Sequence, residues 1–347
     1  MTYSVLLTCV GGQYGPELIC QLKSRFNDVR VVGVDASPVA VGRSFCDQYY
    51  EVPVGANYAY FPTLLEIIKT EKINLVIPTS DEEALVLSEK KRYLEALEVS
   101  VACINPDLLK IFSNKLETYK ILRERGLQVP DTIELENEYD LRCRLEDCLK
   151  SDRDVVLKPP AERGGRGVVV IRQDLEQLLT FGDRREVHCG LTWILADQNR
   201  SVWSELFPKF PLMMMDRLVE PVYDLDLLAW RGEPIYVVPR KRVDSAVPNA
   251  GHEIVFDQNL IELGKTLIRQ FELSWLYDCD VMFDRDGVPM VVEINPRQSG
   301  SVAVTEAAGL PIFSDVITLA RGWSIPTRDI PYGVKVLPRS TLFRDKY

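Results

Sequence analysis

Short apolar runs alternate with segments of helical periodicity over the first hundred residues of the chain. In each helical segment the apolar positions recur every three or four residues. This alternation is typical of a parallel sheet wound with helices. The expected strands are residues 4–10, 29–34, 74–78 and 99–104, and the expected helices are residues 17–26, 61–71 and 82–97.

A second pattern begins near residue 110, where we place a domain boundary. Ser113 and Asn114 are typical helix-capping residues, and they precede a helical period that Gly126 ends. An Asp286-Gly287 pair between two strand-like runs indicates a hairpin. The expected strands are residues 155–158, 168–171, 225–230, 234–238, 277–283 and 288–294, with a helix at residues 259–271.

Length and composition limit what the chain can be. Its 347 residues exceed what one compact core usually holds, so several lobes with a cleft between them are expected. A hydrophobic fraction of 46% and a charged fraction of 27% indicate a globular protein. The net charge of −10 argues against a nucleic-acid partner.

Cysteine usage and the first apolar run bear on location. The eight cysteines form no CxxC pair and have no histidine nearby, so we interpret them as reduced thiols. The apolar run at residues 5–10 is too short to span a membrane and lacks a basic segment before it. We expect a cytoplasmic protein without a membrane partner.

Oxygen ligands cluster on the predicted hairpin. Asp280 lies on its first strand, while Glu293 and Asn295 alternate on the second, so all three can share one face. A set of oxygen ligands alone selects a hard cation such as Mg²⁺, with Mn²⁺ as an alternative. Arg297 extends the same row and could stabilise a transferring phosphoryl group. A half-exposed hairpin with acidic outer positions is the plainer explanation.

Two lysines could bind phosphate. Lys158 ends an apolar strand directly before the glycine-rich segment at residues 162–167, whose amides could cover phosphate oxygens. Lys115 follows the helix cap as a second cation, although a solvated helix lysine is the common alternative. Glycines available for close approach are Gly164, Gly165 and Gly167.

A methionine-rich strand passes into an acidic loop and could form an adenine slot. Methionine packs adaptably on aromatic rings, although methionine runs also fill cores. Glu220 could hold ribose hydroxyls, and Asp224 and Asp226 could orient a substrate or a metal. The candidates around adenosine are Met215, Asp216, Leu218 and Glu220.

Taken in chain order, these segments resemble the ATP-grasp superfamily, and most of all its branch related to carbamoyl phosphate synthetase. The most specific part is the Glu-x-Asn-x-Arg run at Glu293, 13 residues after Asp280. The resemblance spans roughly residues 1–325. It implies an N-terminal pre-ATP-grasp domain at 1–110, a two-lobed ATP-grasp fold at 111–325 divided near 215, and a tail at 326–347.

The resemblance also implies the activity: an ATP- and Mg²⁺-dependent ligase that converts a carboxylate into an acyl phosphate and couples it to an amine. An amino acid is the expected substrate. Asp280, Glu293 and Asn295 would bind Mg²⁺, and Lys115, Lys158 and the glycines would bind phosphate. Arg240, Arg242 and Arg297 would face the acyl phosphate. The partners are then small molecules, and a homodimer is the commonest assembly.

Other functions stay open at this point. Phosphorylation of bicarbonate is the nearest enzymatic alternative, and a nucleotide-binding protein without catalysis is another. A nicotinamide oxidoreductase is suggested by the glycine turn at Gly11, Gly12 and Gly15 with Asp35 beyond it. No G-x-S-x-G elbow supports a hydrolase. His252, after Asn249-Ala250-Gly251, could lie near the substrate, although a role away from the substrate is the more common alternative.

Overall fold

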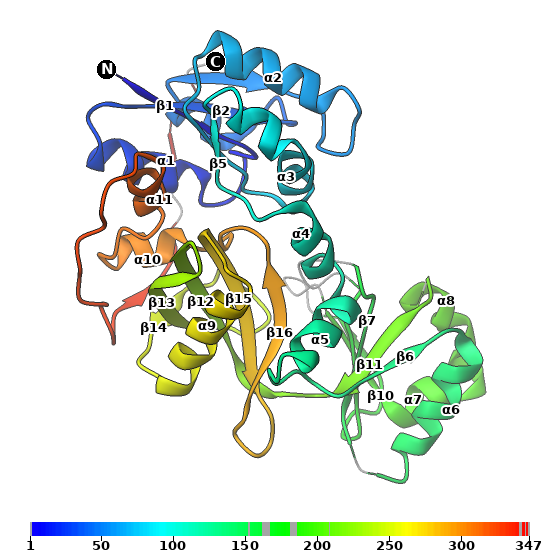
Figure 1. The fold of residues 1–347 in the computed structure, drawn as a ribbon. Coiled ribbons are helices and arrows are strands. Elements are labelled where there is room, and N and C mark those ends of the chain that lie inside the picture. Colours follow the sequence, from blue (N-terminus) through cyan, green and yellow to red (C-terminus); the bar gives the residue numbers. More distant parts are fainter. Residues whose placement is uncertain are drawn as a thin grey trace.

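A computed structural model describes most of the chain, and its strands form three sheets within the described residues (Figure 1). The predicted order, a parallel α/β domain followed by mixed lobes, is confirmed. Among the described residues, no helix is both long and apolar enough to cross a membrane. The structure describes residues 2–151, 153–161, 167–180, 186–207, 209–339, 342–343 and 345.

The first sheet has the strand order β3-β2-β1-β4-β5, and all of its pairs are parallel. The predicted strands and helices are present, while β3 was not predicted because Gln48 and Glu51 interrupt any apolar run. The elements are β1 (Tyr3–Leu7), α1 (Gly15–Arg25), β2 (Val29–Asp35), a 3₁₀ turn (Val41–Phe45), β3 (Gln48–Glu51), α2 (Tyr60–Thr70), β4 (Leu75–Ile77), α3 (Asp81–Glu95) and β5 (Ser100–Val101).

The turn after β1 is held by tight backbone contacts. The amide of Gly11 donates to Oδ2 of Asp35 at 2.7 Å, which ties the end of β1 to the end of β2. Gly15 begins α1 so close to Val10 that an added Cβ would lie 2.2 Å from the carbonyl oxygen of Val10. Gly12 has no such neighbour, since its added Cβ would meet only the Cys9 oxygen at 3.6 Å.

The second sheet has the order β6-β11-β7-β8-β10-β9. It pairs the methionine strand β11 with β7, so that Met213 lies opposite Lys158 and Met215 opposite Val156. Helices cover one side and share a separate apolar core with it. The elements are β6 (Thr132–Leu135), α6 (Glu138–Cys148), β7 (Val155–Lys158), β8 (Val169–Arg172), β9 (Leu178–Thr180), β10 (Val187–Gly190), α7 (Leu191–Leu195), a 3₁₀ turn (Asp197–Val202), α8 (Trp203–Leu206) and β11 (Leu212–Asp216).

The third sheet is antiparallel, with the order β16-β15-β12-β13-β14-β17. The predicted hairpin of β15 and β16 is confirmed. One strand, β17, falls within the segment expected to be a tail and pairs with β14. The elements are β12 (Val219–Trp230), β13 (Glu233–Arg242), β14 (His252–Ile254), α9 (Gln258–Gln270), β15 (Trp275–Phe283), β16 (Pro289–Asn295), α10 (Ala303–Ala307), α11 (Ser314–Ala320) and β17 (Lys335–Val336).

Two helices, α4 (Pro106–Phe112) and α5 (Lys115–Glu124), connect the first sheet to the rest. Asn114 caps α5 by accepting from the next amides, as predicted. Figure 1 shows α5 between β16 and the second sheet. The hydroxyl of Tyr119 on α5 donates to the carbonyl of Val292 at 2.8 Å, which fixes α5 against β16. The boundary proposed near residue 110 therefore lies within α4.

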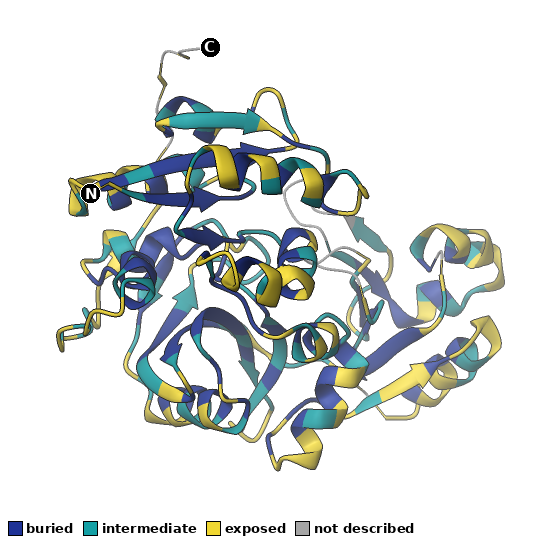
Figure 2. Ribbon diagram, turned by 45° about the horizontal axis from the view of Figure 1, so that its top comes forward, coloured by how far each residue is buried: buried dark blue, intermediate teal, exposed yellow. Residues whose placement is uncertain are grey.

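Burial follows the layers. The strands are largely buried, and the helices turn their exposed sides outward (Figure 2). One apolar core joins the third sheet to residues of the first sheet and to Met213 and Met215 of β11. The first and second sheets each have a further apolar core of their own. The two β lobes therefore meet through Met213 and Met215 of β11 as well as through α5 and the charged side chains beside it, and the candidate site lies there.

We predict that Gly15→Ala destabilises the chain by about 1–3 kcal/mol, because the new methyl group would press on the backbone at Val10. Gly12→Ala, in the same turn, is the matched control and should cost less. Urea unfolding followed by circular dichroism measures both. Equal stability of the two variants would contradict the close approach at Gly15.

Candidate active site

Acidic side chains stand in two rows across one face of the third sheet. Strand pairing places Asp224 opposite Asp280 and Asp280 opposite Glu293, and these three residues form the first row. The second row runs parallel to it and consists of Asp226, Asp278 and Asn295. Because paired residues of an antiparallel sheet point to the same side, the rows are neighbours.

Two arginines of β13 balance these acids. Arg240 is fully buried, and its guanidinium donates to Oδ1 of Asp226 at 2.8 Å and to Oγ of Ser301 at 2.8 Å. Oδ1 of Asp278 lies 3.7 Å from the same guanidinium. Thr305 donates to the other oxygen of Asp226. Arg240 thus braces the second row and the segment after β16, and it has no exposed surface for a ligand.

Arg242 joins the first row. It forms a close ion pair with Asp224 and donates through Nη2 to Oδ2 of Asp280 at 2.8 Å. His252, which is fully buried, contacts the second oxygen of Asp224 through Nε2. Burial and the nearby Arg240 lower the pKa of His252, so its ring is neutral at pH 7. His252 therefore lies behind Asp224, two contacts away from Asp280.

The acids differ in how they respond to burial. Burial opposes ionisation of Asp224, but Arg242 and His252 outweigh it and hold the pKa of Asp224 below its ordinary value. Burial and the neighbouring acids raise the pKa of Asp278 well above its usual range. Burial also raises the pKa of Asp280 to about 7. A cation placed beside Asp280 would favour the ionised forms of these neighbouring acids.

The oxygen atoms available to such a cation are identifiable. Oδ1 of Asp278 and Oδ1 of Asp280 are buried and have no hydrogen-bond partner among the described residues. One carboxylate oxygen each of Asp224, Asp278 and Asp280 can be found within 4.8 Å of one another. Asp280, Glu293 and Asn295, the predicted metal ligands, lie next to one another on β15 and β16. The donors are all oxygen, which fits a hard divalent cation.

Both predicted lysines meet at this edge. Nζ of Lys115 lies 3.0 Å from Oε1 of Glu293, and the amide of Lys115 donates to the carbonyl of Pro160 just after β7. Lys158 is buried and donates to the hydroxyl of Tyr119 at 3.1 Å. Burial and the nearby Lys115 ammonium lower the pKa of Lys158 to about 7. The structure therefore brings Lys115, Lys158 and Glu293 together from three elements.

Arg297 follows β16 and points toward the first domain. Its guanidinium contacts Oδ2 of Asp81, at the start of α3, at 3.3 Å, and donates to the carbonyl of Gln298 at 2.8 Å. Its side chain keeps 17% of its surface exposed, whereas Arg242 keeps 10%. Of the three predicted arginines, these two remain reachable from solvent.

The predicted adenosine residues are spread along the connection between the lobes. Met215 is buried and Leu218 is half-buried. Asp216 is exposed and pairs with Arg153, while Glu220 is exposed and pairs with Arg217. These two acids point to surface partners rather than to one another.

The glycine-rich segment is described only in part. Gly164 and Gly165 lie outside the described residues. Gly167 is exposed and has a positive φ of 70°, a conformation that favours glycine.

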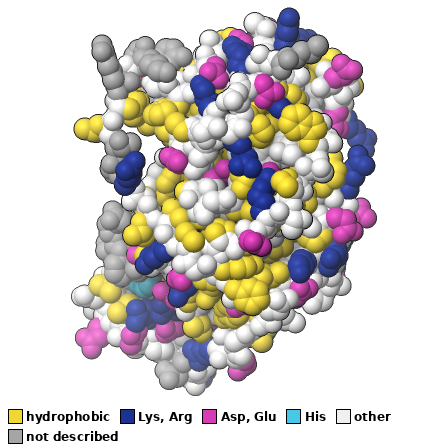
Figure 3. Space-filling view, turned by 90° about the vertical axis from the view of Figure 1, so that its left-hand side faces the viewer, with side chains coloured by type: hydrophobic (Ala, Val, Ile, Leu, Met, Phe, Trp, Pro, Cys, Tyr) yellow, Lys and Arg dark blue, Asp and Glu magenta, His cyan; other side chains and the backbone are white. Residues whose placement is uncertain are grey.

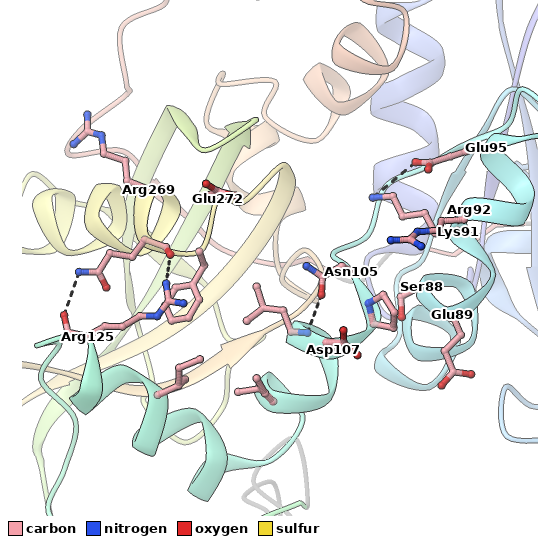
Figure 4. A pocket seen from close by; sticks show the side chains of 16 residues that line it. Ser88, Glu89, Lys91, Arg92, Glu95, Asn105, Asp107, Arg125, Arg269 and Glu272 are labelled. Carbon is pink, nitrogen blue, oxygen red and sulfur yellow. Dashed lines mark hydrogen bonds and ion pairs between the residues drawn. The ribbon is translucent and has the colours of Figure 1, made fainter.

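Two other features lie apart from these rows. Asp35, the acid of the dinucleotide-like pattern, is buried and accepts from the amides of Gly11 and Ser37, which gives it a structural role in the turn. A groove of about 1060 Å³ between α3, α4, α5 and the end of α9 is lined by side chains such as Arg125 and Arg269 (Figure 4). None of the predicted site residues lines that groove.

Sequence reasoning missed Asp278 and Tyr119. Asp278 could have been found, because it precedes Asp280 by two positions and strand alternation puts both on one face. Tyr119 gave no local signal, since its contacts are to Lys158 and to the backbone of Val292, both distant in the sequence.

A parallel α/β domain, followed by two lobes whose lysines meet a row of carboxylates, is the arrangement of the ATP-grasp fold. Three family models match successive parts of the chain. Residues 5–102 match "PylC-like, N-terminal domain", residues 101–196 match "Sugar-transfer associated ATP-grasp", and residues 209–338 match "ATP-grasp in the biosynthetic pathway with Ter operon". The chain belongs to the ATP-grasp superfamily. The closer likeness to carbamoyl phosphate synthetase stays a prediction.

Solved structures share the fold at low sequence identity. The biotin carboxylase domain of 2-oxoglutarate carboxylase from Hydrogenobacter thermophilus, solved with MgADP and bicarbonate, is 13% identical with a TM-score of 0.67, over 96% of this chain and 73% of that one. N5-carboxyaminoimidazole synthetase from Staphylococcus aureus is 13% identical with a TM-score of 0.62, and the match covers 94% of this chain and 79% of that one. L-amino acid ligase from Bacillus licheniformis is 14% identical with a TM-score of 0.63, and the match covers 92% of this chain and 74% of that one. No curated protein matches the chain.

We predict that Lys158→Met raises the thermal midpoint of the nucleotide-free protein at pH 7 by about 2–4 °C, because a buried amine is replaced by an apolar side chain. The unfolded chain holds the Lys158 proton up to about pH 10.5 and the folded chain only to about pH 7. Wild-type stability therefore rises with pH across this window, and the advantage of the variant shrinks toward about pH 9.5.

Differential scanning calorimetry at both pH values measures this effect. Lys120→Met, on the exposed side of α5, is the matched control and should leave the midpoint nearly unchanged at either pH. A lower midpoint for Lys158→Met at pH 7 would contradict the cost assigned to the buried amine.

Proposed function

We propose that this chain is an ATP- and Mg²⁺-dependent ligase that phosphorylates a substrate carboxylate and couples the resulting acyl phosphate to an amine. The MgADP named with the Hydrogenobacter structure and the amino-acid ligase among the similar folds support this choice. An amino acid is the proposed carboxylate substrate, and bicarbonate is the alternative.

One observation carries the proposal: two proposed metal ligands are each held by a cationic side chain from another element. Lys115 of α5 pairs with Glu293, and Arg242 of β13 pairs with Asp280. Such opposed charges are what a site for a metal and a polyphosphate needs. The cations can turn to phosphate oxygens while the carboxylates turn to the metal, so that charge stays balanced at each stage.

The proposed roles follow from position. Lys115 and Lys158 bind phosphate oxygens, with Gly164, Gly165 and Gly167 covering them. Met215 and Leu218 provide apolar surface for adenine, and Asp216 or Glu220 reaches the ribose after leaving its surface partner. Asp280, Glu293 and Asn295 hold Mg²⁺, which would neutralise phosphate charge during transfer.

The arginines take different roles. Arg242 on β13 and Arg297 after β16 retain exposed surface, which supports assigning both of them to contacts with the transferred phosphoryl group. Arg240 is buried and supports the acidic rows through its hydrogen bonds to Ser301 and Asp226. Chemistry then consists of positioning and charge neutralisation, since phosphoryl transfer needs few covalent contacts from the protein.

The distribution of charge on the surface is consistent with small-molecule substrates. On the face in Figure 3, cationic and anionic side chains are interspersed and do not form a single basic stripe. With a net charge of −10, the chain offers no general attraction to nucleic acid. A cytoplasmic location and a homodimer remain predictions.

The test is ADP release by the purified chain with ATP and Mg²⁺, screened against pools of amino acids, other carboxylates and bicarbonate. We predict substrate-dependent release that falls at least about 100-fold in Glu293→Ala, because a charged ligand at the transferring phosphate is lost. Glu233→Ala, an exposed acid of the same sheet, should keep full activity.

Two further readouts separate the alternatives. Hydroxylamine added in place of the amine should yield a hydroxamate if an acyl phosphate forms, and bicarbonate-dependent ADP release without hydroxamate would favour the alternative substrate. Full activity of Glu293→Ala would contradict the proposed site. A thermal shift with NAD(H) or NADP(H) but not with MgATP would overturn the function altogether.

A further inference from the structure

A hydrogen bond fixes which atom of Asn295 can face a metal. Nδ2 of Asn295 donates to Oδ2 of Asp278 at 2.9 Å across the β15–β16 pair. The amide group is planar, so its oxygen points away from Asp278 when its nitrogen points toward it. Only the amide oxygen can bind a divalent cation.

Asp278 is less accessible to a metal ion than Asp280 or Glu293. Its side chain keeps 6% of its surface exposed, against 16% for Asp280 and 19% for Glu293. Its Oδ2 accepts from Asn295, while its Oδ1 has no hydrogen-bond partner among the described residues and lies 3.7 Å from the guanidinium of Arg240. The open edge of the acidic rows therefore lies at Asp280 and Glu293, with Asp278 behind it.

Asp224, the neighbouring acid of the same cluster, already has hydrogen-bond partners on both of its oxygens. Asp224 is almost fully buried and is bound by Arg242 and His252 through both of its oxygens. A cation held by Asp224, Asp278 and Asp280 would have to displace these partners. Among the described residues, a cation at Asp280, Glu293 and Asn295 would displace the contacts of Lys115 with Glu293 and of Arg242 with Asp280 at the exposed edge.

We propose that Asp278 is a positioning residue, braced by Arg240, that orients the Asn295 amide so that its oxygen faces the metal. This inference rests on the proposed function, in which Asn295 is a metal ligand. It also explains the residue type at 295. A carboxylate there would have no N–H to donate to Asp278, whereas the amide gives one donor to Asp278 and one uncharged oxygen to the cation.

Metal affinity of defined variants tests this inference without turnover. The readout is Mn²⁺ binding in the presence of ADP, measured by electron paramagnetic resonance, with ADP affinity in EDTA and the thermal midpoint measured alongside. Asp278→Asn keeps an oxygen that can accept from Asn295, and we expect Mn²⁺ affinity within about threefold of wild type. Asp278→Leu removes the acceptor and should weaken Mn²⁺ binding about 10–100-fold, with ADP affinity in EDTA unchanged.

Rescue separates orientation from general damage. Adding Asn295→Asp to Asp278→Leu should restore Mn²⁺ affinity to within about threefold, because both oxygens of a carboxylate are ligands and no orientation is needed. If Asp278→Leu fails to fold, the smaller Asp278→Val takes its place with the same expectations.

Three results would overturn the inference. Weak Mn²⁺ binding by Asp278→Asn would make the charge of Asp278 necessary, as for a direct ligand. Unchanged Mn²⁺ affinity of Asp278→Leu would show that Asp278 does not orient Asn295. Weak Mn²⁺ binding by the double variant Asp278→Leu, Asn295→Asp would leave Asp278 with only a structural role. If wild type binds no Mn²⁺ with ADP, the proposed function fails together with the inference; in the other three cases the function stands.

Discussion

The third sheet depends on two arginines that stand beside four aspartates. Pairing of β12 with β15 puts Asp224 opposite Asp280 and Asp226 opposite Asp278, so like charges face each other inside the fold. Such a cluster is stable only when each charge has a partner, because removal of a charge from water costs several kcal/mol. Arg240 and Arg242, two positions apart on β13, supply the partners on the same face.

This balance divides the acidic rows into a fixed part and an open part. Around Arg240 every contact is buried, and the pairs with Asp226, Ser301 and Asp278 form a rigid base. Toward Glu293 the side chains become more exposed, and their cationic partners are long side chains that can turn. Precision in a site needs supporting contacts of the first kind, while exchange of ligands needs the second.

Local patterns predicted the elements and the hairpin well, because periodicity, caps and turns are written in neighbouring residues. Asp280, Glu293 and Asn295 were predicted to share a face, and strand pairing places them so. The burial of Arg240 was not predictable, since it depends on Ser301 and Thr305, which come from a segment that returns to the sheet only after β16. The contact of Lys115 with Glu293 joins residues 178 positions apart, and no local pattern encodes it.

The pairing of β12 with β15 also matters before the fold is complete. The hairpin of β12 and β13 can form early because its strands are adjacent in the chain, whereas β15 arrives only after β14 and α9 have been made. Until then the free edge of β12 displays Asp224 and Asp226 on what will become the inner face. Charged side chains on an open strand edge oppose pairing with a second copy of the chain. Asp224 and Asp226 therefore disfavour pairing of an uncovered β12 edge with the edge of another chain.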